Sequence, residues 1–274
     1  LGSGVTSVSI STNGTRYIYF RAVNNAGKAG TVSAAQTTKI DTTQPALKAK
    51  ATSNTMAKGT SAAPMNYFTI TTNYNSSLSG GTTTCKVGST TVTNLNTLAA
   101  GTYTLTCTMK TGTGKTASAS TTINLRSFST DSWAVISSTV KGGYASVYKV
   151  GDTKEVAVSG YGTFTVRLAN NTTPSECNAT TFSQTACGFV VEFVDIITVY
   201  QLNSTDTNIG SWPATKARTF INGTIYNALP ADLKNLIINT RVVSGHGTSD
   251  SANFTSTDKL YLLAVKEVGD AHTD

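Results

Sequence analysis

The sequence predicts a multi-domain protein in which all-β modules precede an α+β domain. A chain of 274 residues and 28.5 kDa is long enough for two or three modules of ordinary size. Over most of the chain, apolar residues alternate with polar ones in short runs, which is the two-residue period of strands. Between Gly210 and Ile238 they recur at helical spacing instead. We therefore expect β-modules at 1–45 and 46–126 and an α+β domain at 132–274.

The composition limits the classes of partner. Charged residues make up only 13% of the chain, about half the usual share, and Thr, Ser, Asn and Gly take their place. The formal charge of +7 comes from Lys and Arg residues that are scattered singly, so we expect no nucleic-acid partner. No run approaches the roughly 18 apolar residues of a membrane span, and we expect no membrane insertion in this sequence.

The first 45 residues predict strands alone. The run RYIYFRAV alternates, and a last strand is expected from Thr31 to Ile40. The stretches YFRAVNNAG and KIDTTQP resemble the closing strands of bacterial immunoglobulin-like and fibronectin type III-like modules, whose copies are commonly joined by a DTTxP linker. Only about three of the roughly seven strands of such a sandwich are present, so the resemblance implies that its first half lies upstream.

The second module predicts short alternating strands separated by glycine-rich turns. Pro45 marks its start, because proline and the residue before it favour an extended link. The segment GTYTLTCTMKTGTGKTA resembles the F strand, turn and G strand of an immunoglobulin-like module, which implies a sandwich that serves as a spacer. The strands expected here are Tyr67–Ile70, Thr84–Val87, Thr90–Leu95, Tyr103–Met109 and Ser118–Leu125.

The four cysteines fall into two close pairs, Cys85 with Cys107 and Cys177 with Cys187. Neither pair has the CxxC form of a zinc site, and histidine is scarce, so two disulfides in an oxidising compartment are expected. Four reduced, buried thiols are the alternative. Cys85 and Cys107 fall on two different expected strands, so their bridge could tie the two sheets of a sandwich together.

The C-terminal half predicts further strands. The stretch Arg126–Asp131 is interpreted as a polar linker, and strands are expected at Ser146–Val150, Glu155–Val158 and Gly162–Leu168. The run GFVVEFVDIITV, residues Gly188–Val199, is apolar at nearly every position. Such a run predicts the buried central strand of the domain.

Two helices are expected between Gly210 and Ile238. Ser211 is placed to cap the first, whose early turn contains Pro213, and Gly223 is expected to end it. Pro230 opens the second. One stripe of this second helix should be buried, because apolar residues recur at i, i+4, i+7 and i+8: Leu229, Leu233, Leu236 and Ile237.

Four blocks of the C-terminal half resemble consecutive parts of one family. It comprises C-terminal domains of bacterial surface proteins, classed as a domain of unknown function, with a C-type-lectin-like fold and with relatives among the variable proteins of diversity-generating retroelements. The resemblance implies a recognition domain, incomplete at its C-terminus because the family's tryptophan-rich closing segment would follow Asp274. The blocks are YKVGDTKEVAVSGYGTFTVRLANNTTPSECN, SQTACGFVVEFVDII, GSWPATKARTFINGTIYNALPADLKNLI and STDKLYLLAVKEV.

Candidate ligand-binding residues are Asp206, Asn208 and Trp212. Oxygen atoms of Asp206, Asn208 and Asp250 could bind calcium, the only cofactor considered, although their spacing lacks the dense pattern of calcium loops and loop capping is the alternative. Trp212 and Tyr226 could stack on a sugar, but a tryptophan at the start of a helix is more often a core anchor.

Catalytic residue types are sparse. Ser244, His246 and Asp250 are the residue types of a nucleophilic triad, but no GxSxG context accompanies them, so His246 is interpreted as a loop residue between glycines. We predict no catalytic residues and no metal site.

Two carboxylates, Glu192 and Asp195, lie within the apolar run. Three residues apart on one strand, they would face opposite sides and could not form an acid/base pair. A structural ion pair with Arg167 or Arg218 is expected for one of them.

The function expected from the sequence is non-catalytic. Immunoglobulin-like modules would form a stalk on a bacterial cell surface, and the lectin-like domain would bind a glycan or protein ligand. The alternatives are a structural protein that self-associates into a fibre or surface layer, and, with less support, a cell-wall hydrolase.

Overall fold

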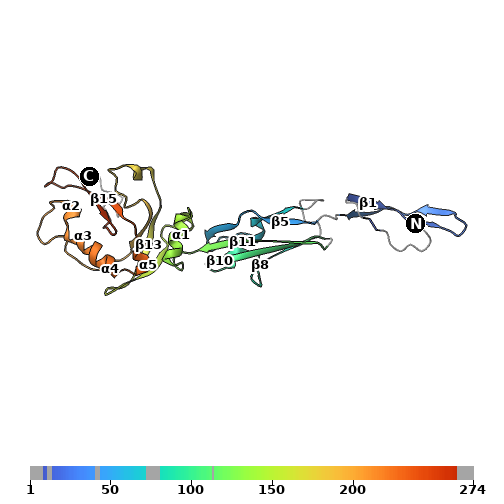
Figure 1. Cartoon of the computed structure of the whole chain (residues 1–274), viewed down its shortest axis with the longest axis horizontal. Coiled ribbons are helices and arrows are strands. Elements are labelled where there is room, and N and C mark those ends of the chain that lie inside the picture. The colour runs from blue at the N-terminus through green and yellow to red at the C-terminus, as the bar shows by residue number, and fades with distance from the viewer. Residues whose placement is uncertain (1–8, 11–13, 41–43, 72–80, 113, 264–274) are drawn as a thin grey trace. The chain divides into compact units, whose positions relative to one another are not determined.

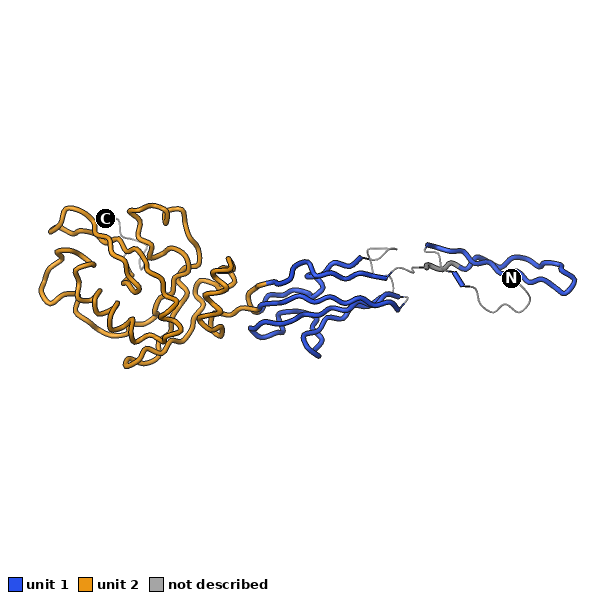
Figure 2. The backbone as a smooth tube through the Cα atoms, viewed as in Figure 1, with its two compact units in different colours: residues 1–54, 59–124 blue, residues 55–58, 125–274 orange. Residues whose placement is uncertain are grey.

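The computed structural model describes residues 9–10, 14–40, 44–71, 81–112 and 114–263. The protein is β-rich with few helices, and its chain divides into two compact units (Figures 1 and 2). Unit 1 comprises residues 1–54 and 59–124, and unit 2 comprises residues 55–58 and 125–274.

The first part of unit 1 consists of two short antiparallel ladders. The turn between β2 and β3 closes because Oδ1 of Asn24 accepts hydrogen bonds from the backbone N–H groups of Ala26 and Lys28, at 3.1 and 2.8 Å. Tyr19 and Phe20 are exposed. Strands form in this part of the chain as expected, but the single strand predicted from Thr31 to Ile40 is divided, because residues 33–35 separate two strands there. The pairs are β1 (Gly14–Ile18) with β4 (Gln36–Ile40) and β2 (Arg21–Val23) with β3 (Ala29–Val32).

The described part of residues 46–126 forms a five-stranded sheet, in the order β6-β11-β10-β8-β9, and a two-stranded antiparallel sheet, β5-β7. In β10 and β11 the alternation is regular, because Leu105, Met109 and Ile123 are fully buried while the Thr and Ser side chains between them face outward. The strands are β5 (Ala46–Ala49), β6 (Ser53–Ala57), β7 (Phe68–Thr71), β8 (Thr82–Val87), β9 (Thr90–Thr91), β10 (Gly101–Lys110) and β11 (Thr116–Arg126).

One expected strand of this module is shorter than predicted. Instead of continuing from Thr90 to Leu95, the chain leaves β9 and forms a short 3₁₀ helix, η2 (Leu95–Thr97). Asn94 causes the change, because its side chain accepts a hydrogen bond from the backbone N–H of Asn96 and caps the helix. A second 3₁₀ helix, η1 (Pro64–Tyr67), precedes β7.

The first disulfide joins Cys85 and Cys107, as predicted. It does not tie two sheets together. The two cysteines lie directly opposite each other on the neighbouring strands β8 and β10, with their Cα atoms 4.0 Å apart. The bridge therefore staples two strands of the same sheet, and the buried cysteines contribute to its core face.

The C-terminal part of unit 2 begins with a helix that was not expected from the sequence, α1 (Trp133–Lys141). Ser132 caps it, because its Oγ accepts a hydrogen bond from the backbone N–H of Val135 at 3.3 Å. Trp133 and Ile136 are buried, and Val140 packs against the same core. These residues are three and four apart, so the helical period was present in the sequence.

An aromatic cluster forms the centre of unit 2. The ring of Phe128 lies 5.8 Å from that of Trp133 and 6.0 Å from that of Tyr148, measured between centroids, and both contacts are edge-to-face. The Tyr148 hydroxyl donates a hydrogen bond of 2.8 Å to Asp131. The interpretation of Arg126–Asp131 as a polar linker is therefore wrong, because Phe128 and Asp131 are buried parts of this core.

The expected strand Ser146–Val150 is also wrong. The chain there forms a 3₁₀ turn, η3 (Ala145–Val147), and then places Tyr148 in the aromatic cluster. The adjacent sheet agrees better with the sequence, since β12 (Thr153–Val158) and β13 (Gly162–Thr172) include both expected strands.

The run Gly188–Val199 is not the central strand of this sheet. The strand order is β12-β13-β14, so β13 is central and β14 (Gly188–Phe193) lies at an edge. The strand ends at Phe193 because the chain bends at Val194, and no described strand pairs with the far side of β14. The prediction of a buried central strand is therefore wrong for both halves of the run.

The region 211–237 is helical, but its boundaries differ from those expected. Ser211 is not the cap, because Gly210 holds that position and Ser211 is already in the helix. Gly223 does not end the first helix, because a π-helical turn carries the chain through it. The elements are α2 (Ser211–Ala214), α3 (Lys216–Phe220), η5 (π-helix, Ile221–Ile225), α4 (Tyr226–Ala228) and α5 (Ala231–Lys234).

The residues of the expected stripe pack on the core, but they do not form the stripe of one helix, because only Leu233 of the four lies within α5. Leu229 belongs to the core of unit 2, and Leu233, Leu236 and Ile237 pack against it together with Phe189 of β14. Pro230 precedes α5 as expected. None of the helices described is long and apolar enough to cross a membrane.

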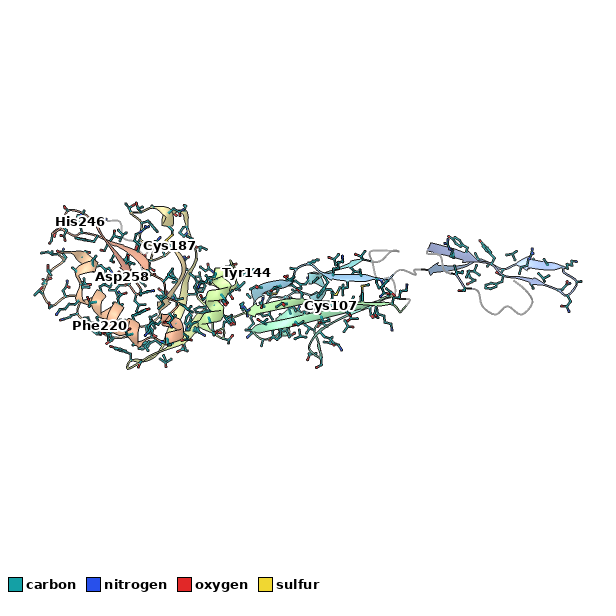
Figure 3. All side chains as sticks on the ribbon, in the orientation of Figure 1. Cys107, Tyr144, Cys187, Phe220, His246 and Asp258 are labelled. Atoms are coloured by element: carbon teal, nitrogen blue, oxygen red, sulfur yellow. A yellow bond between two sulfur atoms is a disulfide. The ribbon has the colours of Figure 1, made fainter. Side chains whose placement is uncertain are left out.

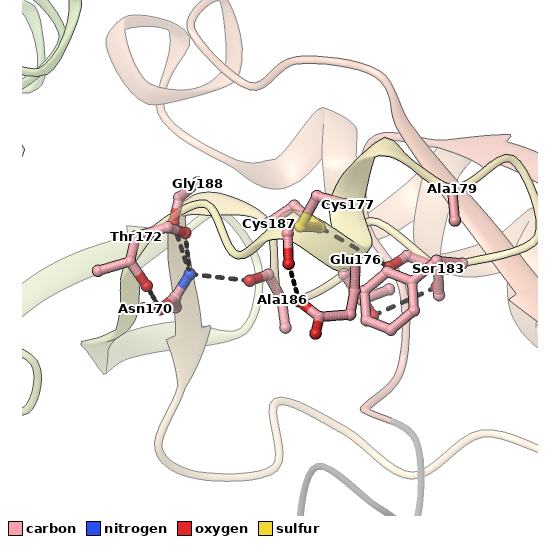
Figure 4. Close-up of a disulfide and its surroundings, with 12 residues drawn as sticks. Asn170, Thr172, Glu176, Cys177, Ala179, Ser183, Ala186, Cys187 and Gly188 are labelled. Atoms are coloured by element: carbon pink, nitrogen blue, oxygen red, sulfur yellow. Dashed lines mark hydrogen bonds between the residues drawn. A yellow bond between two sulfur atoms is a disulfide. The ribbon is translucent and has the colours of Figure 1, made fainter.

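A two-stranded sheet, β15 (Thr240–Ser244) with β16 (Phe254–Asp258), completes the described fold. The second predicted disulfide joins Cys177, in η4 (Ser175–Asn178), to Cys187, which directly precedes β14 (Figure 4). Nδ2 of Asn170 donates to the carbonyl oxygens of Thr172, Ala186 and Gly188 beside this bridge.

Candidate functional site

The candidate site of unit 2 consists of two adjoining loops, residues 202–210 and 245–250, which we call the loop pair. The first loop follows β14 and leads into α2, and the second joins β15 to β16. Leu202 and Ile209 are large apolar residues of the first loop with 54% and 65% of their surface exposed. Neither loop contributes a residue to the described hydrophobic core.

Side-chain hydrogen bonds join the two loops. The backbone N–H of Gly210 donates to Oδ2 of Asp250 at 2.9 Å, and Oγ of Ser249 donates to Oδ1 of Asn208 at 2.6 Å. Gly247 has a φ of +65°, and a Cβ atom at this position would lie 2.6 Å from Nδ2 of Asn208. The site thus requires glycine at this position, both for its backbone conformation and for the close approach of the loops.

The buried carboxylate of Asp258 (Figure 3) binds side chains of α2 and α3, the helices that follow the first loop. Asp258 on β16 is 3% exposed and accepts hydrogen bonds from Nε of Arg218 at 2.7 Å and Nε1 of Trp212 at 2.9 Å. Oγ of Ser256 donates to the same carboxylate at 2.6 Å. Because three donors converge on it, this buried charge is compensated.

Asn222 holds the same helices from the other side. Its Oδ1 accepts hydrogen bonds from the backbone N–H groups of Lys259 and Leu260, and its Nδ2 donates to the carbonyl oxygen of Leu260 at 2.8 Å. The amide of this side chain thus accepts from and donates to backbone groups, as a neighbouring strand would. These bonds hold Asn222 within the π-helical turn, so the helical chain does not end at Gly223.

The predicted ligand residues occupy different positions. Asp206 is exposed, and within the described structure it makes no hydrogen bond or ion pair. Asn208 and Asp250 are used in joining the loops, and Trp212 is half-buried with its ring N–H bound to Asp258. No group of three or more His, Cys, Asp or Glu side chains that could hold a metal ion occurs among the described residues.

Ser244, His246 and Asp250, the residue types of a nucleophilic triad, are not hydrogen-bonded to one another in the described structure. Oγ of Ser244 and Nδ1 of His246 are both buried, and within the described structure neither has a hydrogen-bond partner. Asp250 accepts from Gly210 instead. A nucleophilic serine needs a hydrogen bond to its base, and that bond is missing here.

The expected structural ion pair of the apolar run forms with Arg167. Nε of Arg167, on β13, donates to Glu192, on β14, at 2.8 Å, and the two residues are directly opposite in the ladder. Half of the Arg167 side-chain surface is exposed, so this pair is partly solvated. Asp195 lies beyond the end of the strand and is exposed. The other candidate, Arg218, pairs with Asp258.

A second surface feature is the apolar segment, which we define as residues 194–201, between β14 and the loop pair. Ile196 is 81% exposed and Val199 is 91% exposed. Tyr200 stacks on Phe220 of α3 with ring centroids 4.0 Å apart and an angle of 2° between planes. Exposed aliphatic side chains at this density mark an interaction surface on a folded protein.

Sequence reasoning missed the carboxylate at the centre of the Trp212–Arg218 network. Asp258 was identifiable in principle, because Ser256 and Asp258 occupy alternate positions of one strand and would face the same side. Their burial depends on Trp212 and Arg218, which lie about 40 residues earlier and can be placed beside β16 only in three dimensions.

Comparison with known proteins gives one family match. The model of a family described as Domain of unknown function (DUF6273) matches residues 191–274. No curated protein and no solved structure matches the chain. The matched region includes the apolar segment, both loops of the loop pair, and the helices that lie between these two loops in the sequence.

Proposed function

We propose that this chain is part of a non-catalytic, extracellular binding protein, in which the loop pair contacts a glycan or protein ligand. The β-modules of unit 1 would act as an immunoglobulin-like stalk, and unit 2 would be a C-type-lectin-like recognition domain on a bacterial cell surface. Two disulfides support an oxidising, extracellular setting.

One observation carries the proposal. The loop pair is held by the bond between Gly210 and Asp250 and by the Asp258 network. The side chains of Leu202, Asp206 and Ile209 are exposed on it. Binding residues are commonly placed on loops that a rigid scaffold positions. The loop pair has this arrangement.

The mixture of side chains supports the class of ligand. The first loop combines exposed aliphatic groups with uncharged hydrogen-bonding groups and a single carboxylate, Asp206. Such a surface suits a ligand that offers both apolar faces and hydroxyl or amide groups, as sugars and protein surfaces do.

The lectin-like part of the proposal rests on the sequence blocks from Tyr148 to Val268 and on the order of their elements. A buried apolar strand at Gly188–Val199 was also expected to support it. The structure removes that support, because β14 is an edge strand and Ile196 and Val199 are exposed.

The test is a binding survey of the whole chain against arrays of glycans and of cell-surface proteins, followed by titration of each hit. Replacing Leu202→Ser and Ile209→Ser together should weaken binding about 10-fold or more, because two apolar contacts are lost. Ile238→Ser is the matched control, since Ile238 is 73% exposed but follows α5. A hit that the loop variant binds unchanged, or no saturable binding at all, would contradict the proposal.

Catalysis is tested separately. Turnover of peptidoglycan by the chain that is abolished by His246→Ala would contradict the non-catalytic role.

A further inference from the structure

Within the apolar segment, the backbone of residues 195–201 has no hydrogen-bond partner among the described residues. From Ile196 to Gln201 the chain runs without a turn or bend, and among the described residues no hydrogen bond reaches the backbone of residues 195–201. The segment is fixed at both ends, because Val194 N–H donates to Thr165 at 2.9 Å and the Leu202 carbonyl accepts from Ala217 at 3.1 Å. Residues 195–201 are therefore anchored at both ends, while their backbone N–H and C=O groups have no hydrogen-bond partner among the described residues.

The sequence of this stretch, DIITVYQ, is that of a strand. Ile, Thr, Val and Tyr are the residues most favoured in sheets, and the segment contains no Pro, Gly or Lys. Proteins usually protect a free strand edge with such residues or with a bulge, because an unprotected edge pairs with another chain. The absence of protection here indicates that a partner strand covers the segment.

We propose that this partner is the same segment of a second copy of the chain. Antiparallel pairing about a two-fold axis through Thr198 would place Ile196 opposite Tyr200, and Ile197 opposite Val199, of the second copy. Each is a pair of β-branched or aromatic residues, which are the favourable cross-strand combinations. A two-fold contact also satisfies both strands at once and forms a closed dimer.

Charge supports this register. Asp195 is the only charged residue of the stretch 195–201. The antiparallel register puts it opposite Gln201 of the second copy, whose side-chain amide can donate a hydrogen bond to the carboxylate. A parallel pairing in register would bring two Asp195 side chains together, and like charges opposite each other are unfavourable.

The burial of Ile197 and Val199 also supports this register. Ile197 already packs against the core of unit 2, whereas its neighbour on the same strand face, Val199, is 91% exposed. Pairing would place Val199 beside Ile197 of the second copy and extend both cores across the axis. A contact built on one short strand is small, so the dimer is weak and concentration-dependent.

The first test measures the mass of the whole chain by sedimentation from about 10 µM to about 1 mM, the range of weak association. The dimer fraction should rise over this range. Val199→Lys should abolish the rise, because two lysines would be buried near the axis, while Ile238→Lys, at another exposed aliphatic position, should leave it unchanged.

The second test is covalent capture of the register. In this register Thr198 lies opposite Thr198 of the second copy. Thr198→Cys should therefore form a disulfide-linked dimer under mild oxidation, whereas Ile238→Cys should not. A chain that stays monomeric at about 1 mM would overturn the proposal and leave another protein's strand as the occupant. A dimer that survives Val199→Lys, or that Thr198→Cys fails to link, would equally overturn it. Neither test depends on the ligand of the loop pair.

Discussion

Two apolar regions of unit 2 have opposite surroundings. Phe128, Trp133 and Tyr148 are between 0% and 7% exposed in the aromatic cluster, whereas Ile196 and Val199 of the apolar segment are 81% and 91% exposed. Both regions are rich in large hydrophobic residues. Their hydrogen bonds differ too, because the Tyr148 hydroxyl is bonded to Asp131 while the backbone of residues 195–201 has no hydrogen-bond partner among the described residues.

This comparison separates stability from binding within one domain. Burial of large rings contributes most of the free energy of folding, and residues that remain in water contribute little. The aromatic cluster should therefore dominate the stability of unit 2, and the apolar segment and loop pair should be free to serve contacts with other molecules.

The largest expected effect is on the aromatic cluster. Phe128→Ala should lower the free energy of unfolding of unit 2 by about 4 kcal/mol, because a buried ring is lost and a cavity remains. Both tryptophans of the chain, Trp133 and Trp212, lie in unit 2, so their fluorescence during urea unfolding reports on this unit. Ile196→Ala should change the value by less than about 0.5 kcal/mol. Equal losses for the two variants would refute the contrast.

A smaller loss is expected beneath the loop pair. Arg218→Ala removes one donor from the buried Asp258 carboxylate, which keeps Trp212 and Ser256, so the cost should be about 2 to 3 kcal/mol. Arg167→Ala breaks the half-exposed pair with Glu192 and should cost no more than about 1 kcal/mol. If the two variants unfold alike, the Asp258 network is not what fixes the helices.

The next effect depends on pH. Burial raises the pKa of Tyr148 well above that of a free tyrosine, and the neighbouring Asp131 raises it further. A group whose folded-state pKa is raised contributes fully below the unfolded pKa of about 10, and this contribution is lost as pH rises above that value. Unit 2 should therefore lose stability above about pH 10.

Tyr148→Phe isolates this contribution. The variant should be about 1 kcal/mol less stable at pH 7, because a buried hydrogen bond is lost, and its stability should fall less steeply in alkali. The measurement is tryptophan-monitored urea unfolding at pH 7 and at several higher values. An alkaline fall as steep in the variant as in the parent chain would assign the effect to other groups.

The smallest expected effect on stability is at Asp206. Asp206→Ala should leave the unfolding of unit 2 within about 0.5 kcal/mol of the parent, since Asp206 has no structural partner in the described residues. A loss well above this value, measured by the same tryptophan signal, would show that the carboxylate has a structural task and is not free for a ligand.

Elements that depend on local pattern were predictable. The alternation in β10 and β11 and both disulfides follow from spacing along the chain. The packing of Leu229 and Leu233 on the core was also predicted, although the helix expected there is only four residues long. The helix α1 carried the same kind of evidence in Trp133, Ile136 and Val140, with Ser132 as its cap, but the polar residues between them obscured it.

Other features depend on contacts that sequence spacing does not contain. An apolar run such as Gly188–Val199 has no period, so its composition cannot show whether it is buried, at an edge or exposed. The helix passes through Gly223 because Asn222 binds residues 259–260, far away in the chain. The candidate site was predictable only as a set of loop residues, since the bonds that join the loop pair connect positions about 40 residues apart.

Amide hydrogen exchange of the whole chain tests the central contrast most directly. It should be measured at a concentration where sedimentation shows a monomer. The amides of Ile196–Gln201 should exchange within seconds to minutes, because no described residue accepts a hydrogen bond from them, while those of β13, at the centre of its sheet, should be protected by orders of magnitude. Protection of Ile196–Gln201 equal to that of β13 would contradict the account, because the segment would then be paired within its own chain.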